Sequence, residues 1–156
     1  MPHIHDKIDF CSETFIVYKD AVLLRKHDKL KIWLSVGGHI ELDEDSNQAA
    51  IREVKEEVGL DVVLYCEDGR QPSFEDSKKS LIPPYFLNRH NITDKHEHIA
   101  FVYFAKSRTN ILKLSSTEIT DDCKWFTKAE LIKNDHNIPG DTQFYALKAL
   151  EKLSEK

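Results

Sequence analysis

The chain has 156 residues, of which 40% are hydrophobic and 31% are charged. This balance is typical of one globular domain with a sizeable core, so we predict a single domain over residues 1–156. The formal net charge of −5 argues against a nucleic-acid polymer or an anionic membrane as a partner, because phosphate binding usually requires a basic surface. An acidic protein that handles phosphate groups would need a metal ion in between.

The cysteine content and the amino terminus both indicate an intracellular protein. Cys11, Cys66 and Cys123 are far apart, odd in number, and form no CxxC pair. This pattern argues against a disulfide framework or a structural zinc site. The amino terminus lacks the basic start and apolar run of a secretory signal, and no apolar run approaches the roughly 18 residues of a membrane span. We therefore expect a soluble cytoplasmic protein, either a monomer or a homodimer.

The first predicted elements are β-strands. Residues 13–28 contain two runs rich in Ile, Val and Leu that meet at Lys19-Asp20, which predicts a β-hairpin. Residues 29–35 alternate apolar and other side chains, which predicts a further strand with Leu30 on its apolar face. Two adjacent glycines then interrupt the pattern.

Residues 46–58 carry the pattern of an amphipathic helix. Ser46 is a suitable N-cap, and Gly59 is well placed to end the helix in a left-handed conformation. Apolar side chains recur every three to four residues and predict one buried stripe. This stripe consists of Ala50, Ile51, Val54 and Val58.

The second half of the chain adds further strands and two helices. Residues 68–84 are polar, contain glycine and prolines, and are expected to form a long irregular loop. The other predicted elements are strands at 60–67 and 121–127, a hairpin of 85–92 with 97–107, a helix at 128–135, and a helix from Asp141 or Thr142 to about Leu153 whose stripe includes Phe144. This order predicts an α/β or α+β fold, with a mixed β-sheet sandwiched between helices.

Three glutamates share one face of the predicted helix at 46–58. Glu53, Glu56 and Glu57 are three and four residues apart, and each like-charge pair at this spacing costs about 0.2–0.5 kcal/mol. One interpretation is the solvated face of a Glu-rich helix. The other is a site for a hard divalent cation such as Mg²⁺, which prefers oxygen ligands. The preceding glycine pair favours the cation site, because glycine lets backbone approach a ligand closely.

The spacing from Gly38 to Leu60 follows a defined motif. Gly38 is followed after five residues by Glu44, and after seven more by Arg52-Glu53. The segment then continues as Val54, Lys55, Glu56-Glu57, Val58, Gly59 and Leu60. Every defined position of the Nudix box is present, so the chain resembles the Nudix hydrolase family. The resemblance implies the Nudix fold and an enzyme in which water cleaves a phosphoanhydride bond of a nucleoside diphosphate linked to another group.

The resemblance also implies roles for individual residues. It assigns metal ligation to Glu53, Glu57 and Glu56, with the carbonyl oxygen of Gly37 as a further ligand and Mg²⁺ or Mn²⁺ as the ion. Such ions neutralise developing phosphate charge and lower the pKa of a bound water. Arg52 is expected to orient Glu53 or Glu56 through a salt bridge.

The general base stays open between two carboxylates. One candidate is Glu53, and the other is Glu97 at the start of a predicted strand, whose alternative interpretation is an ordinary polar residue. His96 and His98 flank Glu97 and are expected to be surface polar groups rather than ligands. The predicted catalytic residues are Glu53, Arg52, Glu56 and Glu97.

The substrate class is the least defined part of the prediction. The small size resembles MutT-like pyrophosphohydrolases of nucleoside triphosphates, including oxidised ones. The alternatives are hydrolysis of ADP-ribose, nucleotide sugars or dinucleoside polyphosphates, or a non-catalytic nucleotide-binding module of the same fold. The complete set of box glutamates favours an enzyme. Trp33, Tyr85 and Phe86 are candidates for stacking on a nucleobase, with packing inside the protein as the alternative.

Overall fold

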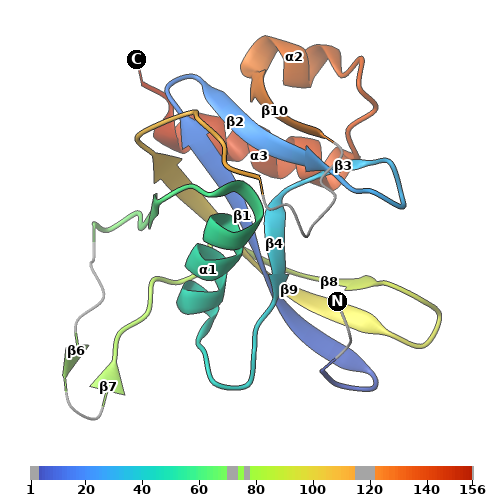
Figure 1. The fold of residues 1–156 in the computed structure, drawn as a ribbon, viewed down its shortest axis with the longest axis vertical. Helices are drawn as coiled ribbons and strands as arrows, with labels where there is room; N and C mark the ends of the chain where they lie inside the picture. The colour runs from blue at the N-terminus through green and yellow to red at the C-terminus, as the bar shows by residue number, and fades with distance from the viewer. Residues whose placement is uncertain (1–3, 70–73, 76–77, 115–121, 156) are drawn as a thin grey trace.

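The computed structural model describes residues 4–69, 74–75, 78–114 and 122–155 (Figure 1). At the centre of its eight-stranded sheet, two long strands, β1 (Ile8–Tyr18) and β9 (Glu97–Ser107), pair in parallel. The other strands of this sheet are β2 (Ala21–Lys26), β3 (Trp33–Leu34), β4 (Val36–His39), β5 (Val62–Leu64), β8 (Phe86–Asn91) and β10 (Asp122–Thr127). The order is β10-β2-β1-β9-β5, while β3, β4 and β8 pair with β2, β1 and β9.

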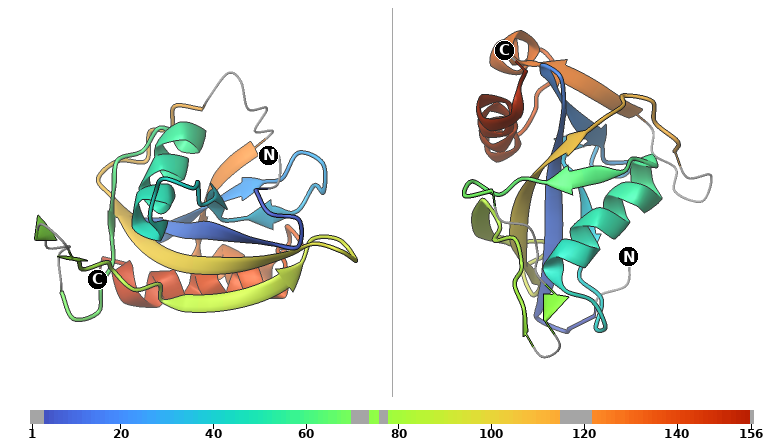
Figure 2. Two further views of the ribbon diagram at one scale, coloured as in Figure 1. Left: turned by 90° about the horizontal axis from the view of Figure 1, so that it is seen from below. Right: turned by 90° about the vertical axis from the view of Figure 1, so that its left-hand side faces the viewer.

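Helices cover both faces of this sheet (Figure 2). The helix α1 (Ser46–Val58) lies on one face, and α3 (Gly140–Leu153) lies on the other, next to the short α2 (Lys128–Lys133). Successive residues of a strand point to opposite faces, and β1 shows this division: Ile16 belongs to the apolar cluster of α1, whereas Phe15 belongs to that of α3. The predicted mixed sheet between helices is confirmed.

The first hairpin is confirmed, but the strand predicted at 29–35 is wrong. Only Trp33–Leu34 pairs as β3. The preceding residues form a loop closed by local backbone bonds, since the His27 N–H donates to Ile32 O at 2.8 Å and Lys31 has a positive φ of 55°. Leu30 consequently lies 64% exposed, and Trp33 is the buried side chain.

The helix α1 has the predicted bounds but a different cap. Asp45, not Ser46, is the N-cap: its carboxylate accepts the N–H groups of Asn47 and Gln48, and the Gln48 side chain accepts the Asp45 N–H. This reciprocal pair satisfies orphan donors of the first turn. Gly59 ends the helix with φ of 71°, as predicted.

The apolar stripe of α1 is narrower than predicted. Ala50, Val54 and Val58 are fully buried, whereas Ile51 is 46% exposed. Each residue of an α-helix is turned by about 100° from the one before it. Ile51 therefore lies about 100° around the helix from Ala50, and its side chain faces solvent. The stripe fixes the helix on the sheet, and Glu53 and Glu57 are buried on the same side of the helix, beside Val54 and Val58.

The remaining elements follow the prediction with shifted ends. The strand predicted at 60–67 shortens to β5, and residue 121 of the strand predicted at 121–127 lies outside the described residues. The predicted loop at 68–84, partly outside the described residues, contains the two-residue strands β6 (Phe74–Glu75) and β7 (Lys78–Lys79), which pair together. The last helix begins at Gly140 behind Pro139 as N-cap, and its Phe144 is about half exposed. Within the described part of the chain, no helix is long and apolar enough to span a membrane.

Candidate active site

The carboxylate of Glu57 is buried between α1 and the sheet. The residue is only 4% exposed. Its Oε1 lies 3.1 Å from Nη2 of Arg25 on β2, and its Oε2 accepts the N–H of Gly37 at 3.2 Å. A buried carboxylate requires such partners, and here they come from two strands that are separate in the sequence. The side chain is therefore held in one orientation by contacts on both oxygens.

Gly37 makes this contact possible because β4 lies unusually close to β1. A Cβ at Gly37 would lie 2.1 Å from the backbone oxygen of Ser12, closer than any side chain tolerates. Glycine is thus required for the β1–β4 pairing that brings the Gly37 N–H to Glu57. The predicted ligand role of the Gly37 carbonyl stays a prediction.

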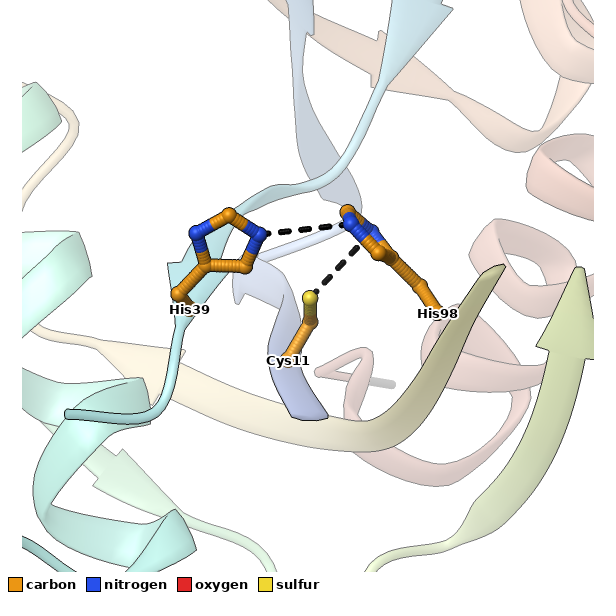
Figure 3. Close-up of side chains that lie close together, drawn as sticks. All are labelled: Cys11, His39 and His98. Carbon is orange, nitrogen blue, oxygen red and sulfur yellow. Dashed lines mark hydrogen bonds between the residues drawn. The ribbon is translucent and has the colours of Figure 1, made fainter. Parts of the chain in front are cut away.

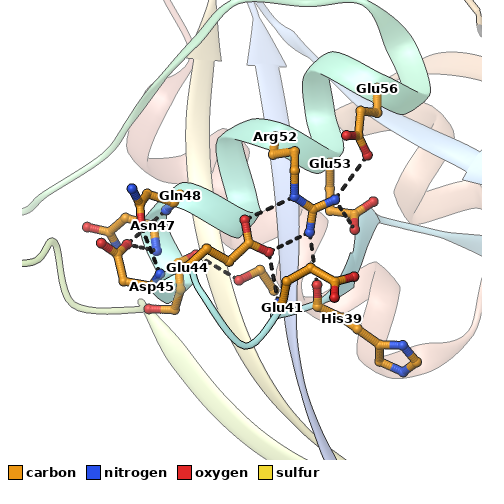
Figure 4. Close-up of polar contacts among 11 residues, drawn as sticks. His39, Glu41, Glu44, Asp45, Asn47, Gln48, Arg52, Glu53 and Glu56 are labelled. Carbon is orange, nitrogen blue, oxygen red and sulfur yellow. Dashed lines mark hydrogen bonds and ion pairs between the residues drawn. The ribbon is translucent and has the colours of Figure 1, made fainter. Parts of the chain in front are cut away.

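Arg52 joins the other acidic residues of the site into one network (Figure 4). Its guanidinium donates to Glu44 from Nε at 3.0 Å and from Nη2 at 2.5 Å, and to Glu53 from Nη1 at 2.8 Å. It also donates to Glu56 at 3.0 Å and to the His39 carbonyl at 3.1 Å. We call Arg52, Glu44, Glu53, Glu56 and this carbonyl the Arg52 network. The planar five-donor fork of arginine suits such a hub, which the single ammonium of lysine does not reproduce.

The three helix glutamates do not share one environment. Glu53 and Glu57 are 2% and 4% exposed, whereas the Glu56 side chain is 57% exposed and reaches Arg52 from the solvent side. The prediction that all three glutamates project into one site is therefore only partly correct. The carboxylates of Glu53 and Glu57 are enclosed, whereas that of Glu56 lies at the edge of the site. The pKa of Glu44 is lowered, first because Arg52 donates hydrogen bonds to its ionised form.

The second candidate base, Glu97, lies in the hairpin of β8 and β9. Its carboxylate forms an ion pair with Arg89, and this hydrogen bond lowers the pKa of Glu97. The interpretation of its histidine neighbours as surface groups is wrong. His96 is 5% exposed and His98 is half-buried, because the amino-terminal segment and β1 pack against them, with the Asp9 carboxylate 3.3 Å from His96 Nε2.

Several residues of the site have no role in the sequence prediction. Arg25 and His39 reach it only through the register of β2 and β4, which no local pattern reveals. On the other face of the sheet, Glu13 is a further residue that the prediction omits, although it alternates with Cys11 and Phe15 in an apolar strand. Burial and the nearby charge of Asp141 raise the pKa of Glu13 to about 7.

The candidate stacking residues are mainly packed within the protein. Trp33 meets Phe126 edge to face at 5.1 Å between ring centroids, and Tyr85 stacks on Phe104 at 4.6 Å. Both contacts belong to the apolar cluster under α3, which agrees with the packing alternative. A separate surface pocket of about 630 Å³ is lined by residues of β5 and the carboxyl terminus, and by none of the box residues.

Comparison with known proteins agrees with this geometry. A family profile described as "NUDIX domain" matches residues 14–147. The solved structure of a NUDIX-family hydrolase from Clostridium perfringens is 37% identical with a TM-score of 0.80, and the match covers 92% of this chain and 96% of that chain. A MutT NUDIX hydrolase from Burkholderia pseudomallei has a TM-score of 0.63 at 19% identity, covering 95% of this chain and 99% of that one, and supports the fold alone.

Among curated proteins, the match is shorter. Dihydroneopterin triphosphate diphosphatase of Escherichia coli (strain K12) is 49% identical over 45 residues, or 29% of this chain and 30% of that protein. The chain therefore matches less than a third of that relative's length. The profile, in contrast, spans most of the chain and includes both the glutamate helix and the strands that hold it. The chain therefore belongs to the NUDIX family.

Proposed function

We propose that the protein is a divalent-metal-dependent pyrophosphohydrolase that converts a nucleoside triphosphate, or a close relative of one, into the monophosphate and pyrophosphate. One observation carries this proposal. Glu53 and Glu57 lie buried on one side of α1, and each is held by an arginine from a different place in the chain. Two enclosed and oriented carboxylates are costly for stability, which favours a functional site over a solvated helix face.

The donor set fits a hard cation. Glu53, Glu57 and the rim carboxylate of Glu56 offer oxygen atoms, which Mg²⁺ and Mn²⁺ prefer over nitrogen or sulfur. Arg25 and Arg52 offset part of the negative charge of these carboxylates. When bound there, such a cation would neutralise phosphate charge and lower the pKa of a water molecule.

The chain's own residues would orient the reaction. Arg52 holds Glu53, while Arg25 and the Gly37 N–H hold Glu57. Glu53 accepts a proton from the attacking water as the water oxygen bonds to phosphorus. The bridging P–O bond breaks, and pyrophosphate leaves with the electron pair. Glu97 is the second candidate for the base; its carboxylate pairs with Arg89 in the hairpin of β8 and β9, which lowers its pKa, and it is not part of the Arg52 network.

The substrate class is supported by the name of one relative. The Escherichia coli protein that matches over 45 residues is named for hydrolysis of dihydroneopterin triphosphate. A triphosphate carrying a fused bicyclic base is therefore our first substrate candidate, ahead of ADP-ribose, nucleotide sugars and dinucleoside polyphosphates.

A substrate panel tests the proposal. The purified protein is incubated with Mg²⁺ or Mn²⁺ and dihydroneopterin triphosphate, dNTPs, oxidised dNTPs, ADP-ribose, a nucleotide sugar and a dinucleoside polyphosphate, and products are separated by ion-exchange chromatography. Reaction in ¹⁸O-labelled water shows which phosphorus receives the oxygen. We expect a labelled monophosphate with unlabelled pyrophosphate. Tight binding without turnover across the whole panel would show a non-catalytic module instead.

Matched variants test the residues. Glu57→Gln and Glu53→Gln each remove one charge and keep the shape, so we expect kcat to fall more than about 100-fold, corresponding to roughly 3 kcal/mol. Glu151→Gln makes the same change at an exposed position of α3 and serves as the control. Full activity in both site variants, with unfolding transitions like the wild type, would remove Glu53 and Glu57 from the mechanism.

A further inference from the structure

A second cluster of metal-binding side chains lies on the opposite face of the sheet from α1. Its members are Asp9, Cys11, His39, His96 and His98, and we call it the histidine cluster. The register of the strands assembles it. Asp9 of β1 is paired with His98 of β9, and Cys11 of β1 is paired with His39 of β4. Because residues paired across strands share a face, residues far apart in the sequence converge here.

Figure 3 shows three members of the cluster, Cys11, His39 and His98, whose side chains face one another at short distances. Nε2 of His39 lies 3.2 Å from Nε2 of His98 and 3.5 Å from Oδ2 of Asp9. The same Asp9 oxygen lies 3.3 Å from Nε2 of His96. The contacts thus form a continuous series from His98 through His39 and Asp9 to His96, in which three imidazole nitrogens and one carboxylate oxygen take part.

Three of the separations, at 3.2, 3.3 and 3.5 Å, match edges of a tetrahedron around zinc, and ligand atoms of Asp9, His96 and His98 all lie within 4.8 Å of one another. Zinc–nitrogen and zinc–oxygen bonds are about 2.0–2.2 Å, so the ligand atoms of a tetrahedral site lie about 3.3–3.5 Å apart. We propose that the histidine cluster is a site for one Zn²⁺-like transition-metal ion, held by Asp9, His96 and His98, with the His39 ring beside them. This site is separate from the carboxylate site of α1 and does not depend on the proposed function.

The Nδ1 atoms of His96 and His98 contact other groups of the protein, and these contacts orient the two rings. Nδ1 of His96 lies 3.3 Å from the carbonyl oxygen of Asp6, and since a carbonyl can only accept, this nitrogen is the protonated donor. Nδ1 of His98 contacts Cys11 Sγ at 3.3 Å. Both histidines therefore direct Nε2 toward the cluster. Metal-binding histidines typically contact an oriented partner through their other nitrogen in this way.

Asp9 is oriented in a similar manner. Its Oδ1 accepts the N–H of His5 at 2.7 Å, and its Oδ2 accepts that of Ile4 at 3.2 Å. The carboxylate is completely buried, and the amino-terminal segment therefore covers the cluster and fixes the oxygen that faces His39 and His96.

The chemistry of the donors distinguishes this site from the carboxylate site. Imidazole nitrogens suit Zn²⁺ and its neighbours among the transition metals, whereas Mg²⁺ prefers oxygen ligands and usually keeps several waters.

Direct metal binding tests the proposal on the full chain without a histidine tag. The protein is dialysed against EDTA and then titrated with Zn²⁺ by calorimetry in excess Mg²⁺, which occupies oxygen-only sites. We expect one Zn²⁺ per chain by elemental analysis, and a melting temperature that rises with Zn²⁺ because the ion binds the folded state. Zn²⁺ binding no tighter than that of the His98→Gln variant would overturn the proposal.

Four variants locate the ion. His98→Gln removes a ligand, and we expect Zn²⁺ affinity to fall by more than about 100-fold, beyond the 10–100-fold typical of losing an outer partner. Cys11→Ser changes such a partner, so a loss within that range is expected. His136→Gln, on an exposed part of the chain, is the matched control and should bind like the wild type. Loss of the Zn²⁺ site in Glu57→Gln, with retention in His98→Gln, would assign the ion to α1 instead.

Discussion

The raised pKa of Glu13 leads to a prediction about stability. Glu13 lies on β1, paired with Gly37 of β4, on the face of the sheet that α3 also covers. Burial is the main cause of its pKa of about 7, and the charge of Asp141 adds to it. The substitution Glu13→Gln keeps the size and hydrogen-bonding capacity of the protonated acid and removes the charge that burial disfavours.

The sign follows from the two protonation states. The unfolded chain releases this proton near pH 4.5, the ordinary pKa, whereas the folded chain keeps it until about pH 7. Between these values the folded state binds more protons, so this group lowers stability as pH rises, and the full loss is reached above pH 7. At about 1.36 kcal/mol per pH unit the loss has an upper limit of roughly 3 kcal/mol. Because Glu13 is only half-buried, we expect about 2 kcal/mol.

Urea unfolding followed by circular dichroism measures this difference at pH 4.5 and pH 8. Glu13→Gln should equal the wild type within about 0.5 kcal/mol at the lower pH and exceed it by about 2 kcal/mol at the higher. Other carboxylates titrate in both proteins, so the difference isolates Glu13. Glu41→Gln, at an exposed position, should change little at either pH. A variant less stable than the wild type at pH 8 would contradict a raised pKa of Glu13 in the folded state.

Three further predictions concern two glycine positions and the Arg52 network. Gly59→Ala should cost more stability than Gly69→Ala: both have φ near 70°, which costs alanine about 1–2 kcal/mol, but only at Gly59 does the new Cβ meet Lys113, at 2.6 Å. Equal unfolding free energies would contradict this reasoning. Gly37→Ala should separate β4 from β1 and cost at least about 3 kcal/mol, visible as faster amide exchange in β4; unchanged exchange would contradict it. Arg52→Lys should lower kcat about 10-fold or more, because lysine cannot bridge the carboxylates; wild-type kinetics would remove the Arg52 network from catalysis.

The sequence predicts best those elements whose signals are local. The helix α1 has the predicted bounds because its apolar period and its terminal Gly59 lie within the segment itself. The strand predicted at 29–35 is wrong because the structure of this segment depends on a contact that its own alternation does not show. Alternation reports which side chains could share a face, but the bond from His27 to Ile32 closes a loop that alternation does not detect. The observed N-cap, Asp45, is one residue before the predicted one, Ser46, because both residues have side chains that suit this position.

The sequence predicts only those residues of the site that lie within the motif. The spacing of the box indicates Glu53 and Glu57, and they are the two buried glutamates of α1. It contains no information about Arg25, which meets Glu57 through the pairing of distant strands. His96 and His98 were misjudged for a related reason. Their spacing in a strand shows that they share a face, but whether that face is covered depends on the amino-terminal segment.

The four residues of β4 connect the two faces of the sheet. The Gly37 N–H holds Glu57, and the His39 carbonyl accepts from Arg52, so the backbone of β4 supports the carboxylate site. The His39 ring lies in the histidine cluster on the other face. A substitution that displaces the β4 backbone, such as Gly37→Ala, therefore disturbs both sites and cannot separate them. Glu57 and His98 lie outside β4 and belong to one site each, so only variants at such positions can show whether catalysis and Zn²⁺ binding are independent.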